Sequence, residues 1–279
     1  MNRKANSRDK KFSGGKEEGK RKEVRRETKA PFKKKTSPKP PGDDSLIRLN
    51  KYIANSGACS RRDADIYIAS GNVRVNGEVI TEMGYKVKPG DTVVFDGKRI
   101  TPEKKEYVLL NKPKGFITTT RDEKGRRTVM DLVSGASGAR LLPVGRLDRN
   151  TTGLLLFTND GELAKKLTHP KYGIRKIYHV SLNRNLHYED LQKIEEGLQL
   201  EDGPVRVDEI SYIDNASKSE VGIKLHSGKN RIIRRIFESL NYEVIKLDRV
   251  IFAGLDKKKL PRGHWRPLTR QEVINLKML

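Results

Sequence analysis

Cysteine is almost absent from this sequence, since Cys59 is the single one among 279 residues. One thiol cannot build an internal disulfide framework or a cysteine-cluster zinc site. The five histidines are scattered along the chain without the spacing of metal ligands. We therefore expect no bound metal.

Long apolar runs are also missing. No stretch approaches the roughly 18 apolar residues that a membrane-spanning helix needs. The amino end is rich in Lys and Arg without the apolar segment of a secretory signal behind it. We expect a cytoplasmic protein with no membrane partner. The sequence contains neither a Walker loop nor a G-x-G-x-x-G motif, so nucleoside triphosphates and dinucleotides are not expected as cofactors.

Acidic residues are too few to balance the basic ones. The chain has 59 Lys and Arg against 36 Asp and Glu, and its net charge is +23. Residues 1–44 hold 16 basic and 7 acidic residues, so the rest of the chain still carries +14. Lys and Arg placed along phosphates release condensed counterions, which makes nucleic acid the expected partner. A merely solvated basic surface is the alternative interpretation.

Composition divides the chain near residue 44. Residues 1–44 mix charged residues with Gly, Ser and Pro and have almost no apolar ones, which predicts a disordered basic arm. From Leu46 apolar residues recur at helical spacing, and Ser60 is a candidate N-cap for a second helix ending near Ser70. Strands about the turn at Asn76 and over 87–95 complete a small domain, expected at 45–104.

The remainder, residues 105–279, alternates between strand and helix patterns. The predicted strands are 107–111, 141–145, 153–157, 174–182, 205–213, 221–226 and 244–252. The predicted helices are 161–168, 188–196 and 230–240. This order is too irregular for repeated βαβ units. We therefore predict the α+β class, with a mixed, largely antiparallel sheet and flanking helices.

One carboxylate lies in unusually basic surroundings. Residues 145–161 read GRLDRNTTGLLLFTNDG, so Asp148 sits between Arg146 and Arg149, before a Thr-Thr-Gly turn and an apolar strand. A side chain at a strand end can project into a cleft from a rigid support. Nearby arginines favour the ionised carboxylate, which suits a nucleophile or base. From the residues alone, a structural ion pair or hydrogen bonds to the turn explain Asp148 slightly better.

Four segments of the first domain resemble the RNA-binding domain named after ribosomal protein S4. They are RLNKYIA at 48–54, SRRDA at 60–64, GNVRVNG at 71–77 and PGD at 89–91. The physical interpretation agrees, because basic side chains on the helices and first strand could follow an RNA backbone from a common face. The candidate RNA-binding residues here are Arg48, Lys51, Arg61, Arg62 and Arg74.

The second domain resembles bacterial ribosomal RNA pseudouridine synthases, in the group that holds small-subunit synthase A and large-subunit synthases B, E and F. The segment around Asp148 carries the resemblance, together with NKPKG at 111–115, KIY at 176–178 and SGKNRIIRRIF at 227–237. The resemblance implies that Asp148 is the essential catalytic residue and that Tyr178 packs on the target base. It also implies that Arg234 pairs with Asp148, with the adjacent Arg235 as the alternative.

The implied reaction isomerises a uridine within RNA, without a cofactor, after the nucleotide has been flipped into a pocket. LQLEDGP at 198–204 and LPRGHW at 260–265 most resemble large-subunit synthase B, so 23S ribosomal RNA is the expected substrate, 16S ribosomal RNA the alternative, and a monomer the expected form. The basic residues near the site are expected to bind RNA, namely Arg146, Arg149, Lys229, Arg231 and Arg235.

Two other functions compete with this hypothesis. A non-catalytic RNA-binding or ribosome-assembly factor would need only the first domain, and it would have no use for an acid that repels phosphate. A glycoside hydrolase acting on a nucleoside would need a partner acid, for which Asp160 and Glu162 are the candidates. Asp160 is, however, a candidate helix N-cap, and Glu162 falls in the first turn of that helix, so both have structural explanations.

Overall fold

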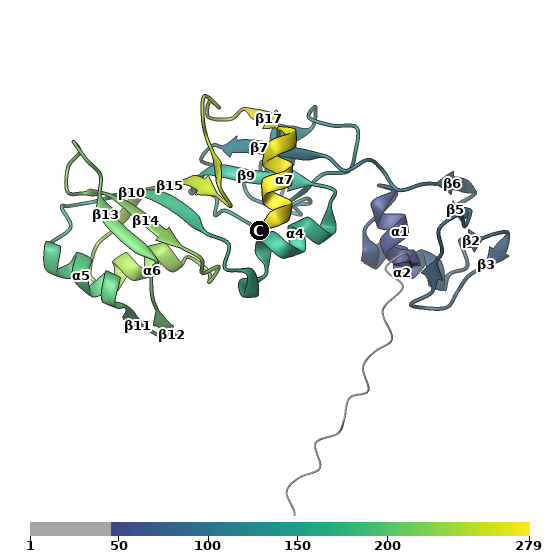
Figure 1. Cartoon of the computed structure of the whole chain (residues 1–279), viewed down its shortest axis with the longest axis horizontal. Helices are drawn as coiled ribbons and strands as arrows, with labels where there is room; N and C mark the ends of the chain where they lie inside the picture. Colours follow the sequence, from purple (N-terminus) through teal and green to yellow (C-terminus); the bar gives the residue numbers. More distant parts are fainter. Residues whose placement is uncertain (1–45) are drawn as a thin grey trace, which may run out of the picture. The chain divides into compact units, whose positions relative to one another are not determined.

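The computed structural model describes residues 46–279 (Figure 1). The predicted disordered arm, residues 1–44, lies outside the described residues. No helix in the described part is long and apolar enough to cross a membrane.

The first structured segment packs two short helices against small sheets. A four-stranded sheet has the order β3-β2-β5-β6, and β1 pairs with β4. Its core includes Leu49, Ile53, Ile68, Val73 and Val93, all at most 2% exposed. The element bounds are β1 (Ile47–Arg48), α1 (Leu49–Asn55), α2 (Arg61–Ala69), β2 (Val73–Val75), β3 (Glu78–Val79), β4 (Lys86–Val87), β5 (Val93–Phe95) and β6 (Lys98–Ile100).

The start of α2 matches the prediction and the start of α1 does not. The Ser60 side chain accepts a hydrogen bond from the Asp63 backbone N–H, and the Asp63 carboxylate accepts one from Ser60 in return, which is a capping box. The first helix was expected from Leu46. Instead, Ile47 and Arg48 form β1, which pairs with β4, and the helix begins at Leu49. Pairing with a distant strand outweighs the local helical spacing there.

The rest of the chain is built on a nine-stranded sheet with the order β13-β14-β10-β15-β9-β7-β17, to which β16 and β8 add at β15 and β9. Every pairing is antiparallel except the one between β15 and β9. The mixed, largely antiparallel sheet is therefore confirmed. The strands are β7 (Tyr107–Lys112), β8 (Leu142–Pro143), β9 (Thr152–Thr158), β10 (Lys176–Leu182), β13 (Glu209–Tyr212), β14 (Glu220–Leu225), β15 (Val244–Phe252), β16 (Leu255–Asp256) and β17 (Trp265–Pro267).

Helices cover the sheet in two groups (Figure 1). In the half around β10, β13 and β14, helices α5 and α6 pack on one core together with the hairpin of β11 and β12. In the other half, α4 and α7 pack on one face of β9, and α3 packs on the opposite face. The bounds are α3 (Val129–Val133), α4 (Gly161–Thr168), α5 (Tyr188–Glu196), β11 (Leu198–Leu200), β12 (Gly203–Val205), α6 (Ile232–Glu238) and α7 (Arg270–Met278).

The apolar run of β9 is explained by burial on both faces. Leu154 and Leu156 face the core beneath α4 and α7, whereas Leu155 and Phe157 face the core beneath α3. A strand covered on both sides has no solvent-facing positions, so its sequence is continuously apolar instead of alternating. The strand is consequently a rigid support for the turn that precedes it.

Gly153 permits the parallel pairing at the centre of the sheet. Its φ is +104°, and a Cβ at this position would overlap the backbone of Arg249 on β15. Only glycine fits such a close approach with this backbone conformation. The glycine of the Thr-Thr-Gly turn is therefore needed where the two halves of the sheet join.

The predicted elements of the second domain hold with three differences. The strand expected at 141–145 is reduced to the two residues of β8, and the strand expected at 205–213 is divided between β12 and β13. The helix expected at 230–240 spans only Ile232–Glu238, because Arg231 has a left-handed backbone with φ of 48°. The helices α3 and α7 and the strands β11, β16 and β17 were not predicted.

Burial of β9 predicts a large stability effect for Phe157, whose side chain is fully buried. Replacing a buried Phe with Ala removes its apolar contacts and leaves a cavity, so Phe157→Ala should lower the free energy of unfolding by about 3–5 kcal/mol. Urea unfolding measures this. The matched control is Ile245→Ala on β15, where the side chain is 49% exposed and a change below about 0.5 kcal/mol is expected. Equal effects would contradict the packing described.

Candidate active site

Asp148 lies in the turn that enters β9, and its neighbours hold it through the backbone. The preceding residue, Leu147, is buried beneath α3. The Leu147 backbone N–H donates to the Thr118 hydroxyl at 3.2 Å, and that hydroxyl donates to the Leu147 carbonyl at 2.8 Å. The Thr151 N–H closes the turn on the Asp148 carbonyl at 3.1 Å. The carboxylate itself is used in none of these contacts.

A buried lysine at the end of β7 organises the same turn. The Lys112 side chain is fully buried. Its ammonium donates to the carbonyls of Asp148 at 3.1 Å, Arg149 at 3.3 Å and Thr151 at 2.9 Å. It also donates to the carbonyl of Pro113 at 3.2 Å. Burial, partly offset by the negative charge of Asp148, lowers the pKa of Lys112 to about 8. A buried cation is tolerated when its donors are satisfied. Lys112 thereby ties three carbonyls of the turn at Asp148 to β7.

A second network anchors the end of the turn to β15. The Asp248 carboxylate accepts hydrogen bonds from the Thr152 hydroxyl at 2.9 Å and from both terminal nitrogens of Arg262, at 2.9 and 3.1 Å, and it pairs with Lys257. Burial raises the pKa of Asp248, but hydrogen bonds from Arg262 and Lys257 outweigh it and lower the value to about 2. Arg262 also donates to the Asn111 side chain at 2.7 Å. This network fixes β9, β15 and β7 together beside Asp148.

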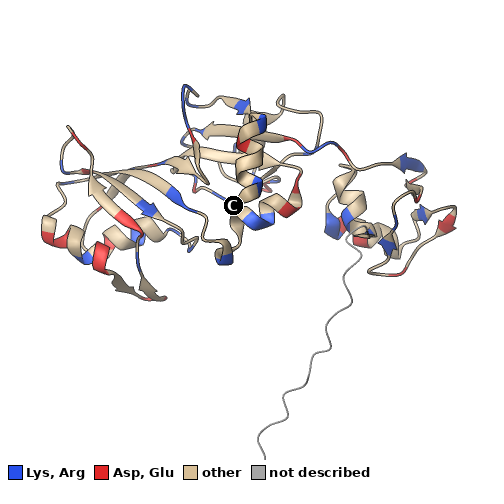
Figure 2. Cartoon of the chain, viewed as in Figure 1, with Lys and Arg blue, Asp and Glu red and all other residues tan. Residues whose placement is uncertain are grey.

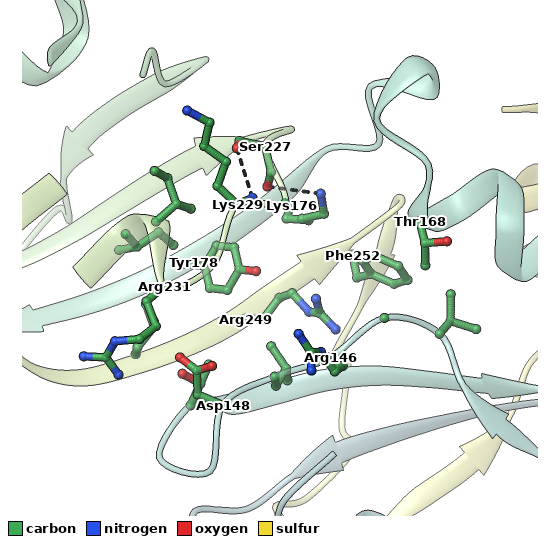
Figure 3. Close-up of a pocket in the computed structure, with 18 of the residues that line it drawn as sticks. Arg146, Asp148, Thr168, Lys176, Tyr178, Ser227, Lys229, Arg231, Arg249 and Phe252 are labelled. Carbon is green, nitrogen blue, oxygen red and sulfur yellow. Dashed lines mark hydrogen bonds between the residues drawn. The ribbon is translucent and has the colours of Figure 1, made fainter. Parts of the chain in front are cut away.

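Asp148 borders a cavity of about 200 Å³ between the two halves of the sheet. Figure 3 shows Tyr178, Arg231, Arg249 and Arg146 around the same space as Asp148. Tyr178 comes from β10, Arg249 from β15 and Arg231 from the start of α6. Other residues that line the cavity include Leu147, Thr151, Thr168, Lys176, Ser227, Gly228, Lys229, Ile232, Ile233, Leu247 and Phe252. One carboxylate thus faces an aromatic ring and several cations.

The structure separates the two candidate arginines of α6. Arg234 is half-buried and donates to the Val244 carbonyl at 2.7 Å. Burial and Arg231 lower the pKa of Arg234, while Asp148 raises it, so its charge and that of Asp148 interact. Arg235 instead pairs with Asp202 at 3.0 Å. Of the two, only Arg234 therefore interacts with the charge of Asp148. Neither arginine lines the cavity, and the ion pairs within residues 46–279 do not include Asp148.

Comparison with known proteins shows the family of this chain. A family model described as RNA pseudouridylate synthase matches residues 106–239, and an S4 domain model matches residues 47–93. Ribosomal large subunit pseudouridine synthase B of Bacillus subtilis is 43% identical over 237 residues, which are 84% of this chain and 97% of that protein. The chain belongs to the RNA pseudouridine synthase family. It is therefore an isomerase that acts on uridine in RNA.

Two further relatives support the family assignment. The dual-specificity RNA pseudouridine synthase RluF of Escherichia coli K12 is 38% identical over 236 residues, which cover 84% of this chain and 79% of that protein. A crystal structure of a pseudouridylate synthase superimposes with a TM-score of 0.60 at 28% identity, covering 82% of this chain and 99% of the other. The fold and the order of the two domains expected from the sequence are confirmed.

The basic residues predicted to bind RNA are distributed over both domains of this synthase. Lys and Arg occur on the helices and strands of the S4 domain as well as on the second domain (Figure 2). In the S4 domain Arg48, Arg61, Arg62 and Arg74 are exposed, whereas Lys51 is half-buried and pairs with Glu162. In the second domain Arg146, Lys229 and Arg231 line the cavity. Arg149 is exposed beside it, and Arg235 is engaged by Asp202.

The rival acids have structural partners. The Asp160 side chain caps α4 by accepting from the Leu163 N–H at 3.3 Å, and it also accepts from the Tyr107 hydroxyl at 2.8 Å. Glu162 lies in the first turn of α4 and pairs with Lys51 at 2.6 Å. Neither residue lines the cavity. In the described part of the chain, no group of three or more His, Cys, Asp and Glu side chains could hold a metal ion.

Sequence reasoning missed three cations of the site, namely Lys112, Lys176 and Arg249. Lys112 and Lys176 belong to the segments NKPKG and KIY, which resemble the family. The sequence therefore contained the pattern, but no role was predicted for either lysine. Arg249 occupies an alternating strand pattern in which a basic residue predicts solvent exposure. Its burial follows from packing between two strands that are 95 residues apart in the chain.

The hydrogen bonds from Lys112 to the turn at Asp148 predict that Lys112→Met slows the reaction. Met keeps the apolar stem but removes the ammonium that holds the turn carbonyls. A displacement of a reacting group by about 1 Å can cost about 10²-fold, so we expect the single-turnover rate at saturating RNA to fall about 10–100-fold. The matched control is the exposed neighbour, in Lys114→Met, for which a change of about twofold or less is expected. A Lys112→Met enzyme as fast as the control would contradict the conclusion that the Lys112 hydrogen bonds position this turn.

Proposed function

We propose that this synthase converts one uridine of 23S ribosomal RNA to pseudouridine. The observation that carries the proposal is the cavity in which the Asp148 carboxylate and the Tyr178 ring share a space bordered by cations (Figure 3). The large-subunit substrate is supported by the 43% identity to the Bacillus protein named as a large-subunit synthase, which extends over 97% of that protein. The alternative substrate, 16S ribosomal RNA, has no observation in its favour.

In this proposal Asp148 acts at the sugar of the flipped uridine, and Tyr178 packs on its base. The bond between N1 and C1′ breaks, the base turns while bound, and a bond forms between C5 and C1′. The proton leaves C5, and N1 gains one, so the RNA product is an isomer of the substrate. Arg234, fixed by the Val244 carbonyl, keeps positive charge near Asp148 as that carboxylate reacts. A turn held through its backbone suits this role, because it leaves the Asp148 carboxylate available to the sugar.

The surrounding basic residues bind RNA in this proposal. Close to the cavity, Arg146, Arg149, Lys229 and Arg231 would contact phosphates that flank the target, and Arg235 would do so outside the cavity. In the S4 domain, expected at 45–104, the same role falls to Arg48, Lys51, Arg61, Arg62 and Arg74. The synthase domain at 105–279 would work in the cytoplasm as a monomer.

The proposal predicts the outcome of pseudouridine mapping in cells that lack this protein. The wild-type gene should restore one pseudouridine in 23S ribosomal RNA, and a gene encoding Asp148→Asn should restore none. Asn keeps the size of the side chain but removes the carboxylate, so binding of purified protein to the target RNA should change about threefold or less, consistent with binding through phosphate contacts. The readout is the modified position in both subunit RNAs.

The matched control is Asp160→Asn, which removes a carboxylate outside the cavity and should restore the modification. Restoration in 16S ribosomal RNA would overturn the proposed substrate. Conversion by pure Asp148→Asn protein would overturn the proposed role of Asp148.

A further inference from the structure

One charged donor inside the catalytic cavity has no partner. Arg249 is 3% exposed, and its Nε donates to the Leu154 carbonyl at 2.7 Å while its guanidinium lies 4.5 Å from the centre of the Phe252 ring. Its Nη2 is buried and makes no hydrogen bond within residues 46–279. A buried charged group without a partner is costly. Such a donor therefore indicates a ligand atom that is bound during function.

The free nitrogen belongs to a side chain on the same face of the sheet as Tyr178. Arg249 on β15 lies directly opposite Tyr178 on β10 in an antiparallel pair, and opposed residues of such a pair project to one side. Both residues line the cavity, and Figure 3 shows the guanidinium of Arg249 between Tyr178 and Arg146. A base that packs on the Tyr178 ring would consequently have its edge near Arg249.

A second cation shares this end of the cavity. Lys176 lies two residues before Tyr178 on β10 and therefore projects to the same face. Its ammonium donates to the carbonyls of His226 at 2.8 Å and Ser227 at 3.3 Å. Burial and the positive charge of Arg249 together lower the pKa of Lys176 to about 8. Within the described residues neither Lys176 nor Arg249 forms an ion pair with a carboxylate, so this end of the cavity has an excess of positive charge.

Two anions of the substrate could use this charge, namely a backbone phosphate and the base itself. A phosphate stays at the rim, where exposed residues such as Arg231 and Lys229 are available. Arg249 is buried beside the ring on which the base packs. When the bond between N1 and C1′ breaks, its electron pair stays with uracil, which becomes an anion with charge on N1 and on the two carbonyl oxygens. The buried position of Arg249 therefore favours the base.

We propose that Arg249, assisted by Lys176, forms a subsite for the uracil anion, in which the free Nη2 donates to a carbonyl oxygen of the base. The proposal rests on the proposed function. The subsite stabilises the charge that develops as the bond to N1 breaks and retains the detached base until C5 bonds to C1′. The C5 proton then leaves to solvent and N1 takes a proton from solvent, so the base is neutral again. Donors fixed in a buried site suit this task because they need no reorganisation.

The test compares two RNA substrates with the same 23S fragment sequence, one with uridine and one with 5-fluorouridine at the target. Fluorine withdraws electrons and makes the base a better leaving group, so cleavage depends less on stabilisation by the protein. We expect Arg249→Met to lower the single-turnover rate of uridine consumption about 10²-fold. On 5-fluorouridine RNA the loss should be about 10-fold or less. Affinity for RNA should change about threefold or less.

Three further variants distinguish stabilisation of the uracil anion by Arg249 from a structural role. Arg249→Lys keeps the charge and should recover part of the rate. Lys176→Met removes the second cation and should show the same smaller loss on 5-fluorouridine RNA, which tests the subsite even if Arg249→Met does not fold. Arg206→Met, at an exposed arginine outside the cavity, is the matched control and should resemble wild type on both RNAs.

The outcomes separate the two proposals. Equal losses on the two substrates would assign Arg249 a structural role and overturn the subsite, as would an Arg249→Met enzyme with the wild-type rate. Wild-type protein that converts no uridine in the 23S fragment would overturn the proposed substrate instead.

Discussion

The hydrogen bonds from the Lys112 ammonium to the carbonyls of the turn at Asp148 are the contacts on which the position of that turn depends. They join a residue at the end of β7 to a turn that begins 36 positions later in the chain. The turn then enters β9, which is buried on both faces and passes β15 at Gly153 without room for a side chain. Asp148 is therefore positioned entirely by contacts of its backbone and neighbours. Its carboxylate remains available to substrate.

Backbone carbonyls also fix three further cations in or near the cavity, and this choice of partner leaves their charges uncancelled. Arg234 donates to the Val244 carbonyl, Arg249 to that of Leu154 and Lys176 to those of His226 and Ser227. A carbonyl orients a cation without cancelling its charge. Other cations pair with carboxylates. Lys229 and Arg231 at the rim of the cavity pair with Asp202 and Glu238, and outside it Arg235 pairs with Asp202 and Arg266 with Glu272. The positive field is thus kept where a polyanionic substrate and a negatively charged leaving group would be bound.

The sequence predicted the local features of this protein better than the long-range ones. Helices α4 and α5 and strand β15 have the expected bounds, because their caps and apolar spacing lie within each segment. Asp148 and Tyr178 were found through family motifs, and the structure brings both to one cavity. The roles of Lys112 and Arg249 could not be predicted, since their partners are 36 to 95 residues away. The helical spacing from Leu46 was overruled in the same way, by the pairing of β1 with β4.

A crystal structure of the wild-type protein with an RNA that carries 5-fluorouridine at the target position tests the central claim most directly. The account predicts that the target nucleotide is flipped into the cavity, with its sugar at the Asp148 carboxylate and its base on the Tyr178 ring. It also predicts a carbonyl oxygen of the base within hydrogen-bonding distance, about 2.7–3.2 Å, of the Arg249 Nη2. A base bound away from Tyr178, or an Arg249 Nη2 that contacts a phosphate instead, would contradict the account.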